Sequence, residues 1–218
     1  VMQAALSDAL TGALLRNTFE DDVTDWLARG AQQGIPVSLL VIDLDYLKLI
    51  NDTFGHLVGD NALATVASCL RAHMHPDDLL FRYGGDEFVV VMPNSSLDQA
   101  SQRAQDMLDT VMTTPLQVEA SRSAGTIDLA ALAETAVTQE VRLSLSIGVA
   151  SVAPHEPTHT ARALFAQADA RVYMSKKRGR GCVTNYDFTV PSRASSDSTS
   201  ELADARMLGR EDVLERVR

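Results

Sequence analysis

The apolar run VSLLVIDL at residues 37–44 constrains the fold of this chain more than any other stretch. It begins after Pro36 and ends in acidic residues, and it lacks the apolar–polar alternation of a strand with one face in water. A continuous apolar run of this length is typical of a strand that is buried on both faces. We therefore expect residues 37–44 to form a central strand of a sheet.

Two further β-rich runs are separated by a pair of glycines. LLFRY at 79–83 and EFVVVM at 87–92 flank Gly84 and Gly85. Two such runs joined by Gly-Gly predict a β-hairpin, because glycine takes positive φ at little cost. One helix is expected to begin at Asp60, an acidic N-cap candidate. The other expected elements are helices at about 97–113 and 161–179 and strands at about 142–152 and 182–188.

The order strand, helix, hairpin, helix, strand, helix, strand predicts an α/β sandwich rather than a repeating βαβ arrangement. A ferredoxin-like fold fits best, with a mainly antiparallel central sheet of about five strands and helices on its faces. Residues 1–188 are expected to form this domain, with an inserted segment at about 115–140 in which IDLAALAETAV adds a short helix. Residues 189–218 are predicted to be a Ser-rich linker and a C-terminal helix.

The composition limits the partners of the chain. Lys and Arg total 19 against 29 Asp and Glu, which gives a formal charge of −10 and a pI of about 4.8. This balance argues against contact with nucleic acid or an anionic membrane surface. The chain has neither the roughly 20 apolar residues that span a bilayer nor a signal peptide, so we expect a cytoplasmic protein. Cys69 and Cys182 are too few and too far apart for a disulfide framework or a zinc site.

Four acidic residues are expected near one another at the end of the sheet. Asp43 and Asp45 end the buried strand, where period two points both side chains the same way. If the glycine turn brings Asp86 and Glu87 beside Asp43, three or four carboxylates converge and need a counter-charge. A divalent cation with oxygen ligands, Mg²⁺ or Mn²⁺, is the usual counter-charge. Taken singly, the same residues are explained more simply as solvated strand-end acids and an ordinary hairpin turn.

The few basic residues are concentrated near these acids. Lys48 follows the first acidic pair, and SKKRGRG places Lys176 and Arg180 around a helix end. A basic set beside a carboxylate cluster favours a polyphosphate ligand. Lys177 and Arg178 are expected to face solvent.

The chain resembles the GGDEF domain of diguanylate cyclases, bacterial enzymes that join two GTP molecules into cyclic di-GMP. Five blocks in one order are far more specific than a lone motif, and they cover roughly residues 8–188. The resemblance implies a nucleotide-cyclase-like version of the sandwich. The blocks are DALTG at 8–12, DLDYLKLINDTFGHLVGD at 43–60, RYGGDEF at 82–88, LSIG at 145–148 and ADARVYMSKKRGRG at 168–181.

The resemblance also implies roles for individual residues. Asp43, the backbone carbonyl of Leu44 and Asp86 are expected to bind the metal, two ions per site, with Glu87 as a second acidic group at the reacting centre. The residues expected at the phosphates are Tyr46 and Leu47 through their backbone, and Lys48, Lys176 and Arg180 through their side chains. Gly181 departs from the family, which usually has Asn at this position.

The guanine base is expected to be bound by Asn51 and Asp60, with His56 lining the same pocket. The chemistry supports Asp60, because guanine presents N1–H and N2–H₂ donors to a carboxylate and adenine lacks the exocyclic N2 donor. An unpaired buried acceptor costs about 1–3 kcal/mol, which is enough to discriminate between the bases. The resemblance further implies that each subunit holds one GTP, so that the active form is a homodimer.

Two further expectations concern regulation. The family often binds its product at an Arg-x-x-Asp motif before the signature, and the corresponding residues here are His75 and Asp78. A single imidazole replaces a bidentate guanidinium, so product inhibition is expected to be weak, unless Arg71 compensates. The resemblance also implies an upstream sensor domain in a longer protein. The alternative function is a catalytically silent GGDEF module that binds GTP and regulates a neighbouring domain.

Overall fold

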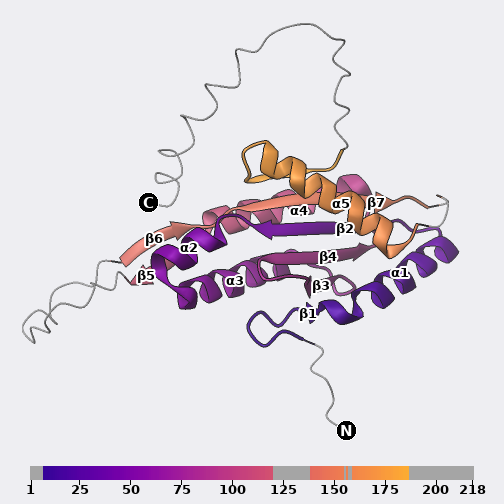
Figure 1. The fold of residues 1–218 in the computed structure, drawn as a ribbon. Coiled ribbons are helices and arrows are strands. Elements are labelled where there is room, and N and C mark those ends of the chain that lie inside the picture. Colours follow the sequence, from indigo (N-terminus) through magenta and orange to yellow (C-terminus); the bar gives the residue numbers. More distant parts are fainter. Residues whose placement is uncertain (1–6, 120–137, 155, 157–158, 187–218) are drawn as a thin grey trace, which may run out of the picture.

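The computed structural model describes residues 7–119, 138–154, 156 and 159–186. A six-stranded sheet with the order β1-β3-β4-β2-β7-β8 lies between layers of helices (Figure 1). The pairings β3–β4, β4–β2 and β2–β7 are antiparallel, whereas β1–β3 and β7–β8 are parallel. The strands are β1 Leu14–Leu15, β2 Val37–Leu44, β3 Leu79–Arg82, β4 Glu87–Pro93, β7 Leu145–Val152 and β8 Cys182–Thr184.

This architecture confirms the predicted α/β sandwich with a mainly antiparallel sheet. The sheet has six strands rather than about five, because β1 adds two residues alongside β3. So short a strand leaves no periodic signal in the sequence. Likewise, β8 ends at Thr184, and the part of the expected 182–188 strand beyond residue 186 lies outside the described residues.

The central strand β2 divides the hydrophobic core into two. Leu40 and Ile42 pack into one cluster, and Leu39 and Val41 pack into the other, because successive side chains of a strand point to opposite faces. All four side chains are fully buried. The prediction that residues 37–44 form a strand buried on both faces is confirmed.

The helices cover these two faces. α1 and α5 pack on the face that carries Leu39 and Val41, and α2, α3 and α4 pack on the opposite face. Near the C-terminal end of β2, α5 ends and α2 begins. The helices are α1 Phe19–Gln33, α2 Leu47–Phe54, α3 His56–Arg71, α4 Leu97–Thr113 and α5 Ala161–Lys177.

Two predicted element boundaries were wrong. The helix expected to begin at Asp60 is α3, which begins at His56 after Gly55, so Asp60 lies in its second turn and not at its N-cap. Gly55 has a φ of 88°, a conformation that glycine adopts at little cost, and this break separates α3 from α2. The strand expected at 142–152 begins at Leu145, because Arg142 belongs to a separate hairpin.

That hairpin pairs β5 Pro115–Glu119 with β6 Thr138–Arg142 and lies against α3 (Figure 1). It forms the two ends of the segment predicted as an insertion at 115–140. The helix expected in IDLAALAETAV and the linker and helix expected at 189–218 lie outside the described residues. Both cysteines are free thiols. None of the helices in the described part of the chain is long and apolar enough to cross a bilayer.

Candidate functional site

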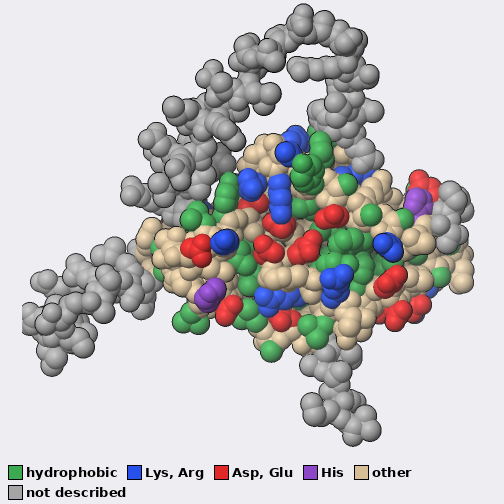
Figure 2. All heavy atoms as spheres, viewed as in Figure 1, with side chains coloured by type: hydrophobic (Ala, Val, Ile, Leu, Met, Phe, Trp, Pro, Cys, Tyr) green, Lys and Arg blue, Asp and Glu red, His purple; other side chains and the backbone are tan. Residues whose placement is uncertain are grey.

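The acids of the signature turn lie beside the end of β2. The register of β2 and β4 sets Asp43 opposite Glu87, and the Leu44 amide donates to the Asp86 carbonyl oxygen at 3.0 Å. Asp43, Asp86 and Glu87 therefore lie together at one end of the sheet, beside the C-terminal end of β2, as the sequence predicted. Figure 2 shows acidic side chains gathered over the end of β2 and the start of β4, with Lys and Arg side chains around them.

The glycines of this turn are explained by space and not by the positive φ that was predicted for them. Neither Gly84 nor Gly85 has a positive φ. A Cβ on Gly84 would lie 3.2 Å from Cβ and Oε2 of Glu87, so the first glycine makes room for that side chain. A Cβ on Gly85 would meet no atom within 4 Å, and its backbone is open to close approach by a ligand.

Lys176, at the C-terminal end of α5, is the counter-charge in this structure. Its Nζ lies 2.6 Å from Oδ2 of Asp43. Burial raises the pKa of Asp43; Lys176 opposes this rise, while the neighbouring Asp86 and Asp45 add to it. Burial also raises the pKa of Glu87, and the negative charge of Asp169 on α5 is the next largest cause. Asp169 lies within the block ADARVYMSKKRGRG, but no role was predicted for it.

This excess of negative charge fits a divalent cation. Asp43, Asp86 and Glu87 can offer carboxylate oxygens, and Leu44 can offer a backbone carbonyl, which are the donors that Mg²⁺ prefers. In the described residues, no three His, Cys, Asp or Glu side chains are arranged to hold an ion by themselves.

Asp45 does not join the acidic cluster in the way that the sequence predicted. β2 ends at Leu44, so the strand period no longer applies one residue later. The Asp45 carboxylate is buried and accepts hydrogen bonds from the hydroxyls of Ser144 and Ser146 and from the Gly181 amide. These partners satisfy its charge locally.

The turn between β2 and α2 presents backbone donors and basic side chains. Tyr46 has a φ of 61°, and α2 begins at Leu47 without a side-chain cap. The N–H groups of a first helical turn have no partner within the helix, so they suit a phosphate. Lys48 is exposed on this turn, and the Arg180 guanidinium lies 5.0 Å from the centre of the Tyr46 ring. The residues predicted to bind phosphate thus lie on the β2–α2 turn and at the end of α5, near the acidic end of β2.

The residues predicted to bind guanine lie where α2 meets α3. A Cβ placed on Gly59 would fall 1.8 Å from Oδ1 of Asn51, so the Asn51 side chain lies directly over that glycine. Asp60 is the next residue and is exposed, as is His56 at the start of α3. The helix break at Gly55 therefore brings Asn51 near the residue before Asp60.

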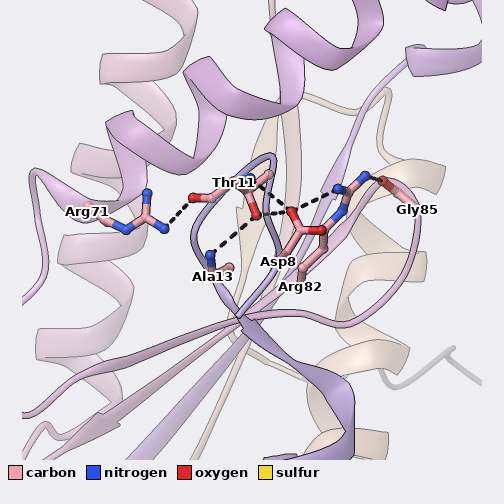
Figure 3. A network of polar contacts seen from close by, with 6 residues as sticks. All are labelled: Asp8, Thr11, Ala13, Arg71, Arg82 and Gly85. Atoms are coloured by element: carbon pink, nitrogen blue, oxygen red, sulfur yellow. Dashed lines mark hydrogen bonds and ion pairs between the residues drawn. The ribbon is translucent and has the colours of Figure 1, made fainter. Parts of the chain in front are cut away.

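An unpredicted polar network joins the turn at residues 8–13 to the hairpin that carries Gly84 and Gly85 (Figure 3). Oδ1 of Asp8 accepts bonds from the Thr11 amide and hydroxyl and lies 3.0 Å from Nη1 of Arg82. Arg82 also donates to the Gly85 carbonyl at 3.0 Å, and Arg71 donates to the Thr11 carbonyl. Asp8 and Arg82 belong to two of the recognised blocks, DALTG and RYGGDEF. Their opposite charges were the one feature of the sequence that could have indicated this ion pair.

The expected product site lies in a separate hollow. A cavity of about 440 Å³ is lined by Arg71, His75 and Asp78, among others. Oδ2 of Asp78 is already bound by the Arg103 guanidinium of α4 and by the His75 amide. The other oxygen, Oδ1, is buried and has no hydrogen-bond partner among the described residues. Arg71 does reach this cavity, but its guanidinium also bonds to Thr11.

Comparison with known proteins identifies the family. A family model described as "Diguanylate cyclase, GGDEF domain" matches residues 5–131, so the chain belongs to the GGDEF family. The response regulator PleD of Caulobacter vibrioides is 35% identical over 182 residues, which cover 84% of this chain and 36% of PleD. Diguanylate cyclase DosC of Escherichia coli is 33% identical over 176 residues, 81% of this chain and 34% of DosC. The chain thus spans about a third of the length of these relatives.

Solved structures agree with the fold. The GGDEF domain of DgcB from Caulobacter crescentus, in complex with c-di-GMP, aligns with a TM-score of 0.71 and 26% identity over 85% of this chain and 98% of that one. The GGDEF domain of YfiN from Pseudomonas aeruginosa aligns with a TM-score of 0.69 and 30% identity, over 83% and 94% of the two chains.

Proposed function

We propose that this chain is a diguanylate cyclase that condenses two GTP molecules into cyclic di-GMP and two pyrophosphates. The observation that carries the proposal is the convergence of Asp43, Asp86 and Glu87 with Lys176 at one end of the sheet. This end of the sheet combines acidic side chains that suit a cation with basic side chains that suit a polyphosphate. The names of the relatives support the same activity.

Each half of the reaction forms one phosphodiester. The 3′-oxygen of one GTP attacks the α-phosphorus of the other, the hydroxyl proton is lost, and the bond to the leaving pyrophosphate breaks. Lys48, Lys176 and Arg180 attract and orient the triphosphate, together with the backbone at Tyr46 and Leu47. Glu87 adds negative charge beside the reacting centre.

The metal would be held by Asp43, Asp86 and the Leu44 carbonyl, as one or two Mg²⁺ or Mn²⁺ ions. When bound, such ions polarise the phosphoryl oxygens and lower the pKa of the attacking hydroxyl. Lys176 pairs with Asp43 at the same place, so its ammonium group would lie beside both the metal site and the triphosphate.

Asn51 and Asp60 bind the guanine edge in this proposal, and His56 lines the pocket. Because one chain binds one GTP, two chains face each other as a homodimer so that each 3′-hydroxyl meets the other α-phosphorus. Sensor domains elsewhere in a longer cytoplasmic protein would control that encounter.

Incubation of the purified chain with GTP and Mg²⁺, followed by chromatography, tests the proposal. We expect cyclic di-GMP and pyrophosphate in a ratio of about 1 to 2, and no corresponding product from ATP. Binding of GTP without turnover would instead favour the silent regulatory module. The intact acidic signature and basic set favour the enzyme.

A further inference from the structure

The two acids of the Asp-Leu-Asp sequence each face a different basic residue near the end of α5. Asp43 pairs with Lys176, with 2.6 Å between Oδ2 and Nζ. Asp45 faces Arg180, with 3.8 Å between Oδ1 and Nε. The first pair is partly exposed, whereas the Asp45 side chain is fully buried. The two acids therefore differ in what they can do.

The surroundings of Asp45 are those of a structural anchor. Ser144 donates its hydroxyl to Oδ2 at 2.8 Å, and Ser146 donates to Oδ1 at 2.7 Å. The Gly181 amide donates to Oδ2 at 3.1 Å. A buried carboxylate with three hydrogen bonds is fixed in place, because breaking any of them leaves charge unpaired in the interior.

The segment that Asp45 holds has an unusual backbone. Gly179, Arg180 and Gly181 have φ angles of 104°, 66° and 56°, so three successive residues are left-handed. A non-glycine residue adopts this conformation at a cost, and surrounding contacts must maintain it. Asp45 contacts two of the three residues, through the Gly181 amide and Nε of Arg180. At Gly181, a Cβ would lie 3.1 Å from Oγ of Ser144, so the glycine also keeps this serine in reach of Asp45.

These contacts determine where the Arg180 guanidinium lies. Its Nε faces Asp45 and its plane lies near the Tyr46 ring, at the start of α2. A guanidinium whose Nε faces a carboxylate at this ion-pair distance still has its two terminal nitrogens for a phosphate. The hydrogen bonds from Ser144 and Ser146 connect Asp45 to the start of β7.

We infer that Asp45 is a positioning residue that holds Arg180 toward the triphosphate, and that it is not a metal ligand. The inference rests on the proposed function, since it takes Arg180 as a phosphate contact. It assigns different tasks to the two acids: Asp43 lies in the cation site, and Asp45 sets the geometry of the phosphate site.

A double-mutant cycle tests this assignment. The probe is 3′-deoxy-GTP with Mg²⁺, which lacks the attacking hydroxyl and cannot be condensed, and binding is measured by calorimetry. Asp45→Asn and Arg180→Ala are each expected to weaken binding by about tenfold. The double variant is expected to bind no more weakly than Arg180→Ala alone, because Asp45 acts through Arg180. Ser38→Ala is the control: it removes a buried hydroxyl near the start of β2 and should bind the nucleotide as the unaltered chain does.

The outcomes separate the two claims. If Arg180→Ala does not weaken binding, the phosphate role of Arg180 fails and the inference falls with it. If Arg180→Ala weakens binding but Asp45→Asn does not, or if the two losses multiply, only the positioning role is overturned. Should Asp45→Asn fail to fold, Ser146→Ala decides: a loss of about threefold that disappears in the Arg180→Ala background supports the inference, and an equal loss in both backgrounds overturns it.

Discussion

Asp86 is an exposed residue whose proposed role as a metal ligand does not depend on packing. It lies on the turn between β3 and β4, and its backbone carbonyl accepts the Leu44 amide, a bond that a substitution of the side chain keeps. Its carboxylate instead adds to the negative charge that raises the pKa of Asp43.

We therefore expect Asp86→Ala to lower cyclic di-GMP formation by at least about 100-fold, because the variant loses a proposed metal ligand. The free energy of unfolding should change by less than about 1 kcal/mol. Initial rates and urea denaturation measure the two quantities. Asp109→Asn, on α4, is the matched control and should retain full activity. Turnover that survives in Asp86→Ala would contradict the metal assignment.

Asp8 gives the fold a dependence on pH. Burial alone raises the pKa of Asp8, but the hydrogen bonds from Thr11 and Arg82 together lower it below the ordinary value of 3.8. A lowered pKa in the folded state means that Asp8 contributes stability above pH 3.8 and that this contribution is lost as the pH falls through the folded-state pKa.

Asp8→Asn should accordingly be destabilised by about 1–2 kcal/mol at pH 7, and the difference from the unaltered chain should disappear near pH 2. Urea denaturation across this pH range measures it, with Asp25→Asn, an exposed residue of α1, as control. A difference that stays constant down to pH 2 would show that the Asp8 charge does not stabilise the fold.

At the scale of elements, Gly59 leaves room between α2 and α3 for the Asn51 side chain. A Cβ there would occupy the position of the Asn51 amide oxygen. Alanine favours a helix interior over glycine by about 1 kcal/mol, and the displaced group is the end of a flexible side chain. Stability and base recognition should therefore respond differently to the same substitution.

We expect Gly59→Ala to keep its unfolding free energy within about 1 kcal/mol while GTP affinity falls about tenfold and the preference for GTP over ATP narrows. Calorimetry with both nucleotides measures this, and Asn61→Ala on the same helix is the control. If Gly59→Ala bound GTP with unchanged selectivity, Asn51 would not be part of the base pocket.

The prediction of weak product inhibition depends on two residues in the turn between α3 and β3, His75 and Asp78. Asp78 is 7% exposed and already pairs with Arg103, so its carboxylate is poorly placed to bind another partner. His75 offers one imidazole in place of a bidentate guanidinium. Initial rates with added cyclic di-GMP should show weak inhibition, and His75→Arg should strengthen it. Strong inhibition of the unaltered chain would mean that Arg71, which lines the same cavity, compensates.

At the scale of the whole molecule, the sequence predicted the features that local patterns determine. Residues 37–44 identified β2, and the glycine pair located the hairpin that carries Asp86. The sequence could not separate Asp45 from Asp43, because the two differ only in tertiary partners: Ser144 and Ser146 are about 100 residues away in the chain. The same holds for Arg103, which reaches Asp78 from α4.

The start of α3 was mispredicted for a local reason. Gly55 allows a sharp break that is followed at once by a new helix, and a helix-capping rule placed the start at Asp60 instead. The break is what lets α2 and α3 lie side by side, with Asn51 over Gly59.

The rate of cyclic di-GMP formation per chain, measured from nanomolar to micromolar protein with GTP and Mg²⁺, tests the central claim most directly. The proposed reaction needs two facing chains for each product, so the rate per chain should rise with protein concentration and then level off as dimers saturate. Asp86→Ala should stay near zero throughout. Saturating GTP binding with no cyclic di-GMP at any protein concentration would contradict the account and identify the chain as a silent module.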